Sequence, residues 1–252
     1  MIHEITVNSD ASKKSDLWND LLYEMDQMNE KGKTIFNTGI SRTKTRVHCG
    51  SIEIEISGPT PYLVGKGIGG LDNEQRTITS NSLSASFNIY WQEIGVAYLA
   101  GDMDQIGLDD LLRHEPDLTS SILVFPHHGG KTNDADLKQF VETICDQINP
   151  HTIIFSIGRN KFQNPRPEIV SAIKNKIKDV RISCTQLSKH CMKDIEFRGY
   201  SHLVDVFSRG REDYCCCSGS FIISLGKNVE YFPELAHHQQ FIKSATISPL
   251  CL

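Results

Sequence analysis

Three side chains that could bind a metal ion follow two short apolar segments, each where a strand is expected to end. Asp102 follows residues 96–100, and His127 and His128 follow residues 122–125. Short apolar runs bounded by turn residues are typical of buried strands, and layered α/β folds place their chemistry at strand ends. One carboxylate and two imidazoles form a ligand set that Zn²⁺ or Mn²⁺ accepts. The sequence therefore predicts a divalent metal site.

Each of these residues also has a plain structural interpretation. An aspartate after Gly101 is common in turns, and a His-His pair is often part of a loop. We favour metal binding because both motifs stand at expected strand ends. One histidine would then be a terminal ligand, and the other would contact a substrate oxygen or orient a ligand. Gly129 and Gly130 would let a substrate or metal approach the backbone, whereas Asp104 is expected to cap the next helix.

The motifs Leu99-Ala-Gly-Asp102 and Phe125-Pro-His-His-Gly-Gly130 resemble the metallo-β-lactamase superfamily, most closely the hydrolase domain of ComEC-type competence proteins. Asn81-Ser-Leu-Ser84 resembles the lead-in to the first motif in that branch, and residues 153–165 resemble its later Ser-x-Gly-x-Asn element. The resemblance covers about residues 35–200. It implies an αββα sandwich whose two metal ions, Zn²⁺ or Mn²⁺, activate a water for attack. For this branch it also implies a phosphodiester substrate, either nucleic acid or a nucleotide.

The resemblance assigns roles to individual residues. Asp102 would bridge two metal ions, His127 or His128 would be the terminal ligand, and Asn160 would join the catalytic group. Asn164 stands where the family has a histidine, and an amide is a poor metal ligand or proton-transfer group, so catalysis at that position stays open. The expected substrate contacts are Asn81, Ser84, Gly129 and Arg159. The cluster Arg159, Lys161 and Arg166 would contact a phosphate backbone or consist of ordinary solvated charges.

The His-x-His-x-Asp-His motif, which supplies most metal ligands in this superfamily, is missing, and His3 and His48 lack its spacing. By the resemblance, the chain corresponds to the C-terminal half of the domain. Residues 1–200 would be the C-terminal part of the sandwich, and residues 201–252 a Cys-rich segment with its closing strand. The front half could be a partner polypeptide, the reading frame could be truncated, or the chain could be an inactive remnant. The first two are favoured, because an unfinished sandwich exposes strand edges and apolar surface.

A second group of possible metal ligands is rich in cysteine. Structural zinc takes four thiolate or imidazole ligands, and irregular segments use it in place of a core. No Cys-x-x-Cys pair is present, so a set of buried free thiols is the alternative. Cys251 is isolated in the sequence and is expected to be structural. The zinc candidates are Cys184, Cys191, Cys215 and Cys217, with His190 or His202 as further ligands.

The elements that must position these residues alternate between strand and helix, which predicts an α/β layered fold. The apolar face of residues 15–30 is expected to pack in the core, and residues 64–80 are expected to form a flexible surface loop. The predicted strands are residues 2–7, 51–56, 83–90, 96–100, 122–125, 152–157, 180–184 and 221–225. The predicted helices are residues 15–30, 105–113, 135–147 and 167–178.

The composition limits the class of protein. The 252 residues are 39% hydrophobic and 23% charged, as in ordinary globular proteins. The net charge of -5 argues against broad nonspecific binding of nucleic acid. No apolar run approaches the roughly 18 residues of a membrane span, so no membrane partner is expected. Eight cysteines without a secretory signal favour a reducing compartment, the cytoplasm.

Two functions follow from these observations. The first is a subunit of a metal-dependent phosphodiester hydrolase, such as a nuclease in a bacterial antiviral defence complex, which a second polypeptide completes. The alternative is a catalytically inactive module that binds a partner through its open sheet edge. Metal content distinguishes the two, since only the first needs two metal ions that depend on Asp102.

Overall fold

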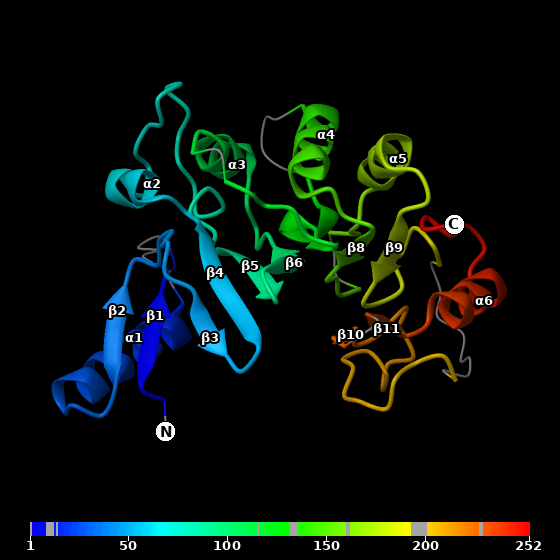
Figure 1. Cartoon of the computed structure of the whole chain (residues 1–252), viewed down its shortest axis with the longest axis horizontal. Helices are drawn as coiled ribbons and strands as arrows, with labels where there is room; N and C mark the ends of the chain where they lie inside the picture. The colour runs from blue at the N-terminus through cyan, green and yellow to red at the C-terminus, as the bar shows by residue number, and fades with distance from the viewer. Residues whose placement is uncertain are drawn as a thin grey trace. The chain divides into compact units, whose positions relative to one another are not determined.

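The computed structural model describes residues 2–8, 13, 15–114, 116–131, 136–159, 162–192, 201–226 and 229–252. Within these residues the chain is α/β, as predicted, with six α-helices and a mixed seven-stranded sheet of order β3-β4-β5-β6-β7-β8-β9 (Figure 1). Two smaller sheets pair β1 with β2 and β10 with β11. The strands are β1 (Glu4–Val7), β2 (Ile35–Thr38), β3 (Val47–Cys49), β4 (Ile52–Gly58), β5 (Ser86–Trp91), β6 (Ile94–Leu99), β7 (Ile122–Val124), β8 (Thr152–Phe155), β9 (Arg181–Cys184), β10 (Ile222–Ser224) and β11 (Glu230–Phe232). The helices are α1 (Asp16–Glu30), α2 (Pro61–Lys66), α3 (Gln105–Leu112), α4 (Leu137–Ile148), α5 (Pro167–Lys176) and α6 (Leu235–Ala245), with a 3₁₀ turn η1 at Pro126–Gly129.

The chain divides into two compact units. The first comprises Met1–Asn88 and Ala100–Pro116, and the second comprises Ile89–Leu99 and Asp117–Leu252. The sequence analysis predicted that residues 1–200 and 201–252 are two parts of one family domain. That prediction does not concern compact units, so it stays a prediction. No helix in the described part of the chain is both long and apolar enough to cross a membrane.

The first unit begins with a strand, a helix and a strand. β1 and β2 pair in parallel, with Glu4 opposite Ile35. Between them, α1 begins where predicted, because the Ser15 side chain accepts a hydrogen bond from the Trp18 backbone amide at 3.4 Å. Gly32 follows the helix with a φ of 62°, which is the left-handed conformation expected at a helix end.

The apolar face of α1 does not enter a core, and this sequence prediction was wrong. None of the residues of α1 is buried, and Leu17 is 79% exposed. The two strands of this small sheet are themselves only exposed or half-buried. A two-stranded sheet is too narrow to bury an amphipathic helix. Periodicity correctly predicted the helix and its apolar stripe, but not what covers the stripe.

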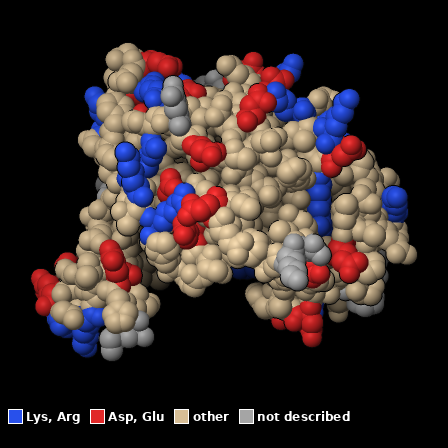
Figure 2. Space-filling model, viewed as in Figure 1, with Lys and Arg blue, Asp and Glu red and all other residues tan. Residues whose placement is uncertain are grey.

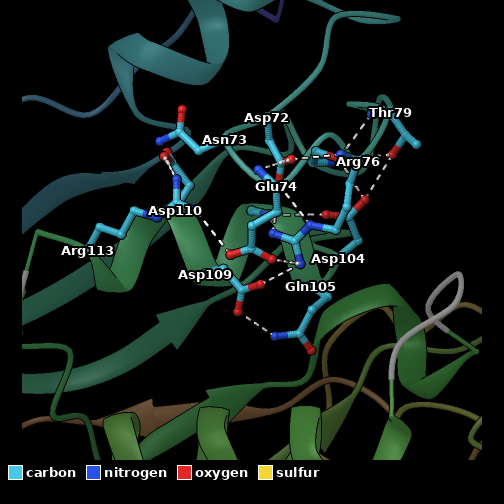
Figure 3. Close-up of polar contacts among 12 residues, drawn as sticks. Asp72, Asn73, Glu74, Arg76, Thr79, Asp104, Gln105, Asp109, Asp110 and Arg113 are labelled. Carbon is cyan, nitrogen blue, oxygen red and sulfur yellow. Dashed lines mark hydrogen bonds and ion pairs between the residues drawn. The ribbon is translucent and has the colours of Figure 1, made fainter.

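Residues 64–80, predicted to form a flexible surface loop, begin with the end of α2 and make packing and polar contacts. Leu63 of α2 packs with Ile78, Leu83 and Ile106 in a buried cluster. A polar network then ties the loop to α3 (Figure 3). Arg76 Nε donates to Asp72 Oδ2 at 2.8 Å and Arg76 Nη1 donates to Asp109 Oδ2 at 2.7 Å.

Asp104 caps α3, as predicted. Its Oδ1 accepts a hydrogen bond from the Gly107 backbone amide at 3.0 Å. Its Oδ2 accepts from Ser82 Oγ at 2.7 Å and from Thr79 Oγ1 at 2.9 Å (Figure 3). The carboxylate is only 6% exposed, so these bonds replace water at both oxygens. This arrangement accounts for Asp104 as a structural residue.

Replacing Arg76 with glutamine is expected to lower the thermal unfolding midpoint by about 4–8 °C. Burial would raise the pKa of Asp72, but hydrogen bonds from the Arg76 backbone amide and guanidinium outweigh burial and hold this pKa below its usual range. Without the guanidinium, a carboxylate that is 3% exposed loses its cation, at a cost of about 2 kcal/mol. Differential scanning calorimetry measures the effect. Lys138→Gln, which removes an exposed ion pair with Glu142, should shift the midpoint by less than about 2 °C.

The second unit is built on four parallel strands, β6 to β9. Ile122 and Ile154 on one face form a buried cluster, which the β10–β11 ribbon covers through Phe221 and Tyr231. In Figure 1, α4 and α5 lie on the opposite side of these strands. Because the strands are parallel, β7, β8 and β9 have their carboxyl ends at one edge of the sheet. The segments that follow these three strands carry the site described next.

Candidate functional site

The turn after β7 holds two consecutive histidines in the left-handed backbone conformation. His127 has φ 50° and ψ 32°, His128 has φ 56° and ψ 20°, and Gly129 continues at φ 72°. This conformation costs a residue with a Cβ atom about 1–2 kcal/mol. Such strain persists only where the surrounding structure fixes it, and it concentrates at functional sites. The two predicted ligands therefore lie on the kind of backbone that functional sites use.

One of these histidines is oriented by the main chain of the neighbouring strand. His128 Nδ1 lies 2.6 Å from the carbonyl oxygen of Ser156, just after β8. Because a carbonyl only accepts hydrogen bonds, Nδ1 carries the proton, and in the neutral ring the lone pair is then on Nε2. Histidines that bind metals are commonly held this way, by a hydrogen bond from the second ring nitrogen.

A second segment packs directly on the histidine turn. The Arg166 backbone amide donates to the Gly129 carbonyl at 2.9 Å. A Cβ atom on Gly129 would lie 2.7 Å from the Phe155 ring and 2.7 Å from Pro165. A Cβ atom on Gly130 would lie 3.2 Å from Asn164 Nδ2. The structure therefore brings Asn164 to the turn, and the missing side chain of Gly129 is explained by packing.

The basic cluster predicted around Arg159 is only partly described. Asn160, a predicted catalytic residue, and Lys161 lie outside the described residues. Arg166 is exposed and precedes α5 as its N-cap residue. Arg159 is half-buried and lines a pocket.

This pocket has a volume of about 820 Å³ and opens at the carboxyl ends of β8 and β9. Its walls come from residues 156–159, 185–189 and 208–221. Ser156 lines the pocket and also holds His128 through its carbonyl, so the pocket adjoins the histidine turn. A ligand in an open α/β sheet is expected at this edge.

Two residues that the sequence analysis did not select hold the pocket together. Thr185 Oγ1 donates to the Ile157 carbonyl at 2.9 Å and accepts from the Ile157 amide at 2.8 Å. Gln186 Oε1 accepts from the Arg159 amide at 3.0 Å, and Gln186 Nε2 donates to the Arg209 carbonyl at 3.1 Å. Both follow the strand predicted at residues 180–184. Like Asp102, they are polar residues just after a predicted strand, so the same pattern would have predicted them.

Three further predicted residues belong to the first unit. The Asp102 amide donates to Ser84 Oγ at 2.8 Å, and the Ser84 amide donates to the Asn81 carbonyl at 3.1 Å. The structure thus joins Asn81, Ser84 and Asp102 in one turn cluster, on a unit other than that of the histidines.

The zinc candidates separate into two places. Cys217 Sγ lies 3.2 Å from His238 Nε2, and the Cys191 sulfur accepts from the Leu250 amide at 3.5 Å. Cys215 instead donates from its sulfur to Gln186 Oε1 at 3.5 Å and lines the pocket.

The buried thiols influence one another. Burial raises the pKa of Cys184 well above its usual value, and the nearby thiols Cys217, Cys251 and Cys191 raise it further. Cys251, which is isolated in the sequence, therefore lies with this group. Among the described residues, no three or more His, Cys, Asp or Glu side chains are arranged to hold a metal ion. The structural zinc site stays a prediction.

The buried imidazole of His238 is expected to make the protein acid-sensitive. Burial, together with the smaller effects of His202 and Arg181, lowers the pKa of His238 to about 3. Below pH 6.5 the unfolded chain binds a proton that the folded state excludes, so the free energy of unfolding should fall by about 1.4 kcal/mol per pH unit between pH 6.5 and 4. Urea unfolding between pH 7 and 4.5 measures this slope. His238→Gln should flatten it relative to the wild type, whereas the exposed-site variant His151→Gln should keep it; equal slopes in all three would contradict the assignment.

No protein-family model matches this chain, and a comparison with curated proteins finds no match.

Proposed function

We propose that this chain is one part of a metal-dependent phosphodiester hydrolase with a metallo-β-lactamase-like αββα sandwich of the ComEC-type branch. A second polypeptide would complete the sandwich and its site. The observation that carries the proposal is the histidine turn after β7, where His128 Nδ1 is bound to the Ser156 carbonyl. This bond directs the lone pair of the neutral ring to Nε2, the nitrogen that a metal would take.

The proposed ligands of this chain have the donor atoms that a metal site uses. His127 and His128 offer imidazole nitrogens and Asp102 offers a carboxylate, a set that Zn²⁺ and Mn²⁺ accept. The described residues contain no arranged group of three or more such side chains, so the proposal takes the remaining ligands from the partner. The chemistry that two bound metal ions supply is activation of water and neutralisation of phosphate charge.

The chain's own residues would position the substrate. Arg159 in the adjoining pocket carries a fixed positive charge suited to phosphate. Asn164, beside the histidine turn, has an amide that can donate a hydrogen bond to a phosphate oxygen. In this proposal Ser84 holds the Asp102 backbone and so orients its carboxylate.

Exposed apolar side chains on α1 support a partner. Leu17 and Tyr23 are 79% and 63% exposed, and the short β1–β2 sheet leaves strand edges unpaired within the described chain. Exposed apolar surface next to open strand edges invites pairing with another chain. All eight cysteines are free thiols, which fits a cytoplasmic complex.

The test is to purify the tagged chain with whatever copurifies from its native cells. Metal content is measured by mass spectrometry, and hydrolysis of a chromogenic phosphodiester is measured with added Zn²⁺ or Mn²⁺. The proposal expects two metal ions per complex, both lost in Asp102→Ala, together with phosphodiesterase activity. One further zinc that is lost in Cys184→Ser would support the structural zinc site.

The second candidate is a catalytically inactive interaction module. The unburied face of α1 favours it as much as it favours a hydrolase subunit. A complex that holds no metal through Asp102 or the histidines, and hydrolyses no phosphodiester, would select this candidate.

A further inference from the structure

We propose that the pocket at the ends of β8 and β9 binds a phosphate-bearing ligand of nucleotide size. The inference takes its ligand class from the proposed hydrolase, but binding itself requires neither metal nor hydrolysis. It rests on the charge, the walls and the volume of a pocket that lies within one compact unit.

Positive charge dominates the described lining of the pocket. Its described lining residues include three cationic side chains, Arg159, Lys189 and Arg209, and one carboxylate, Asp213. Cationic side chains form short, charge-assisted hydrogen bonds with phosphate oxygens. The local excess of positive charge therefore favours a phosphate over a neutral or cationic ligand.

The guanidinium of Arg159 is held in place before any ligand arrives. Its Nη1 donates to the Leu187 carbonyl at 2.9 Å and its Nη2 donates to the Met192 carbonyl at 3.0 Å. Both of these acceptors are uncharged, so these two bonds orient the guanidinium without neutralising its charge. A preorganised cation loses less side-chain entropy when it binds an anion.

The pocket also has an apolar wall. Phe221 lines it with the part of its ring that neither packs on the cluster of Ile122 and Ile154 nor lies under the Arg181 guanidinium, which is 4.9 Å from the ring centre. An aromatic ring can stack on a base. The volume of about 820 Å³ is in the range of small-molecule sites. These features fit a ligand that carries both a phosphate and a base.

The charge of the chain argues for a local ligand over a long nucleic acid. On the face shown in Figure 2, Lys and Arg atoms are interspersed with Asp and Glu atoms. The net charge of the chain is -5. A long nucleic acid needs a continuous basic surface to bind its phosphates. We therefore assign a mononucleotide, and not a longer nucleic acid, as the ligand of the pocket.

Calorimetric titration of the full chain, without added metal, tests the proposal with inorganic phosphate, adenosine monophosphate and a single-stranded oligonucleotide. Replacing both Lys189 and Arg209 with glutamine should weaken mononucleotide binding about tenfold or more. Asp213→Asn should strengthen it about two- to threefold. Lys243→Gln removes an exposed lysine of α6 that does not line the pocket, and it should change the affinity less than twofold.

The outcomes separate this proposal from the hydrolase. Failure of the wild-type chain to bind the mononucleotide overturns the pocket assignment, as does equal weakening by the double variant and by Lys243→Gln. Binding of the oligonucleotide alone, or of inorganic phosphate alone, overturns the nucleotide assignment. Mononucleotide binding that depends on Lys189 and Arg209 supports it, even when the complex holds no metal and the hydrolase proposal fails.

Discussion

Alanine in place of His128 is expected to lower the metal-dependent phosphodiesterase rate of the proposed hydrolase complex at least about 100-fold. The Ser156 carbonyl fixes the ring so that Nε2 carries the lone pair, and alanine removes that donor. Apparent metal affinity should fall at least about tenfold in the same variant. Initial rates with a chromogenic phosphodiester and competition with a chelator measure the two quantities.

His151→Ala provides the matched control, since His151 is an exposed histidine of the same unit that stands just before β8. It should keep both the rate and the metal affinity within about twofold. Equal far-ultraviolet circular dichroism and unfolding midpoints would show that His128→Ala still folds. A folded His128→Ala complex that keeps its rate within threefold would contradict the proposed role of His128 as a metal ligand.

Gly129→Ala is expected to be the most destabilising single methyl addition at the site, with a loss of about 3 kcal/mol. The left-handed φ of 72° contributes about 1–2 kcal/mol. A Cβ atom at 2.7 Å from both Phe155 and Pro165 adds about 1–3 kcal/mol of overpacking. The thermal midpoint should therefore fall by about 6–12 °C in calorimetry.

Gly32→Ala separates the two contributions. Gly32 has a similar left-handed φ, 62°, but nothing lies within 4 Å of its Cβ position. It carries the backbone cost of about 1–2 kcal/mol without the steric clash, so its midpoint should fall by only about 2–8 °C. If the two variants lose equal stability, the contacts of Phe155 and Pro165 do not constrain the turn.

Local interactions made much of the fold predictable. Ser15, Asp104 and Pro167 mark the starts of α1, α3 and α5, because each satisfies or removes backbone donors within one turn. The helix α6 was not predicted, since Glu234 makes no side-chain cap and no comparable signal marks its start. The strand β11 has three residues, too few to show an alternating pattern.

The site was predictable only where its residues follow a strand. His127 and His128 stand directly after an apolar run, so the sequence selects them. Lys189 and Arg209 lie on irregular segments, and the Gln186 side chain joins these segments by its hydrogen bond to the Arg209 carbonyl. Only tertiary contacts bring the two cations to one pocket, so the sequence does not predict it. The same holds for Cys251, whose place beside the other buried thiols depends on the path of the chain after α6.

The leucines on the open side of α1 bear on how much of this protein a cell can maintain. Chaperones and proteases act on chains whose apolar surface stays exposed. Molecules whose α1 remains exposed to solvent would be degraded faster than molecules whose α1 is covered. The steady-state amount of this protein would then depend more on the amount of the partner that covers α1 than on the rate at which the chain is synthesised.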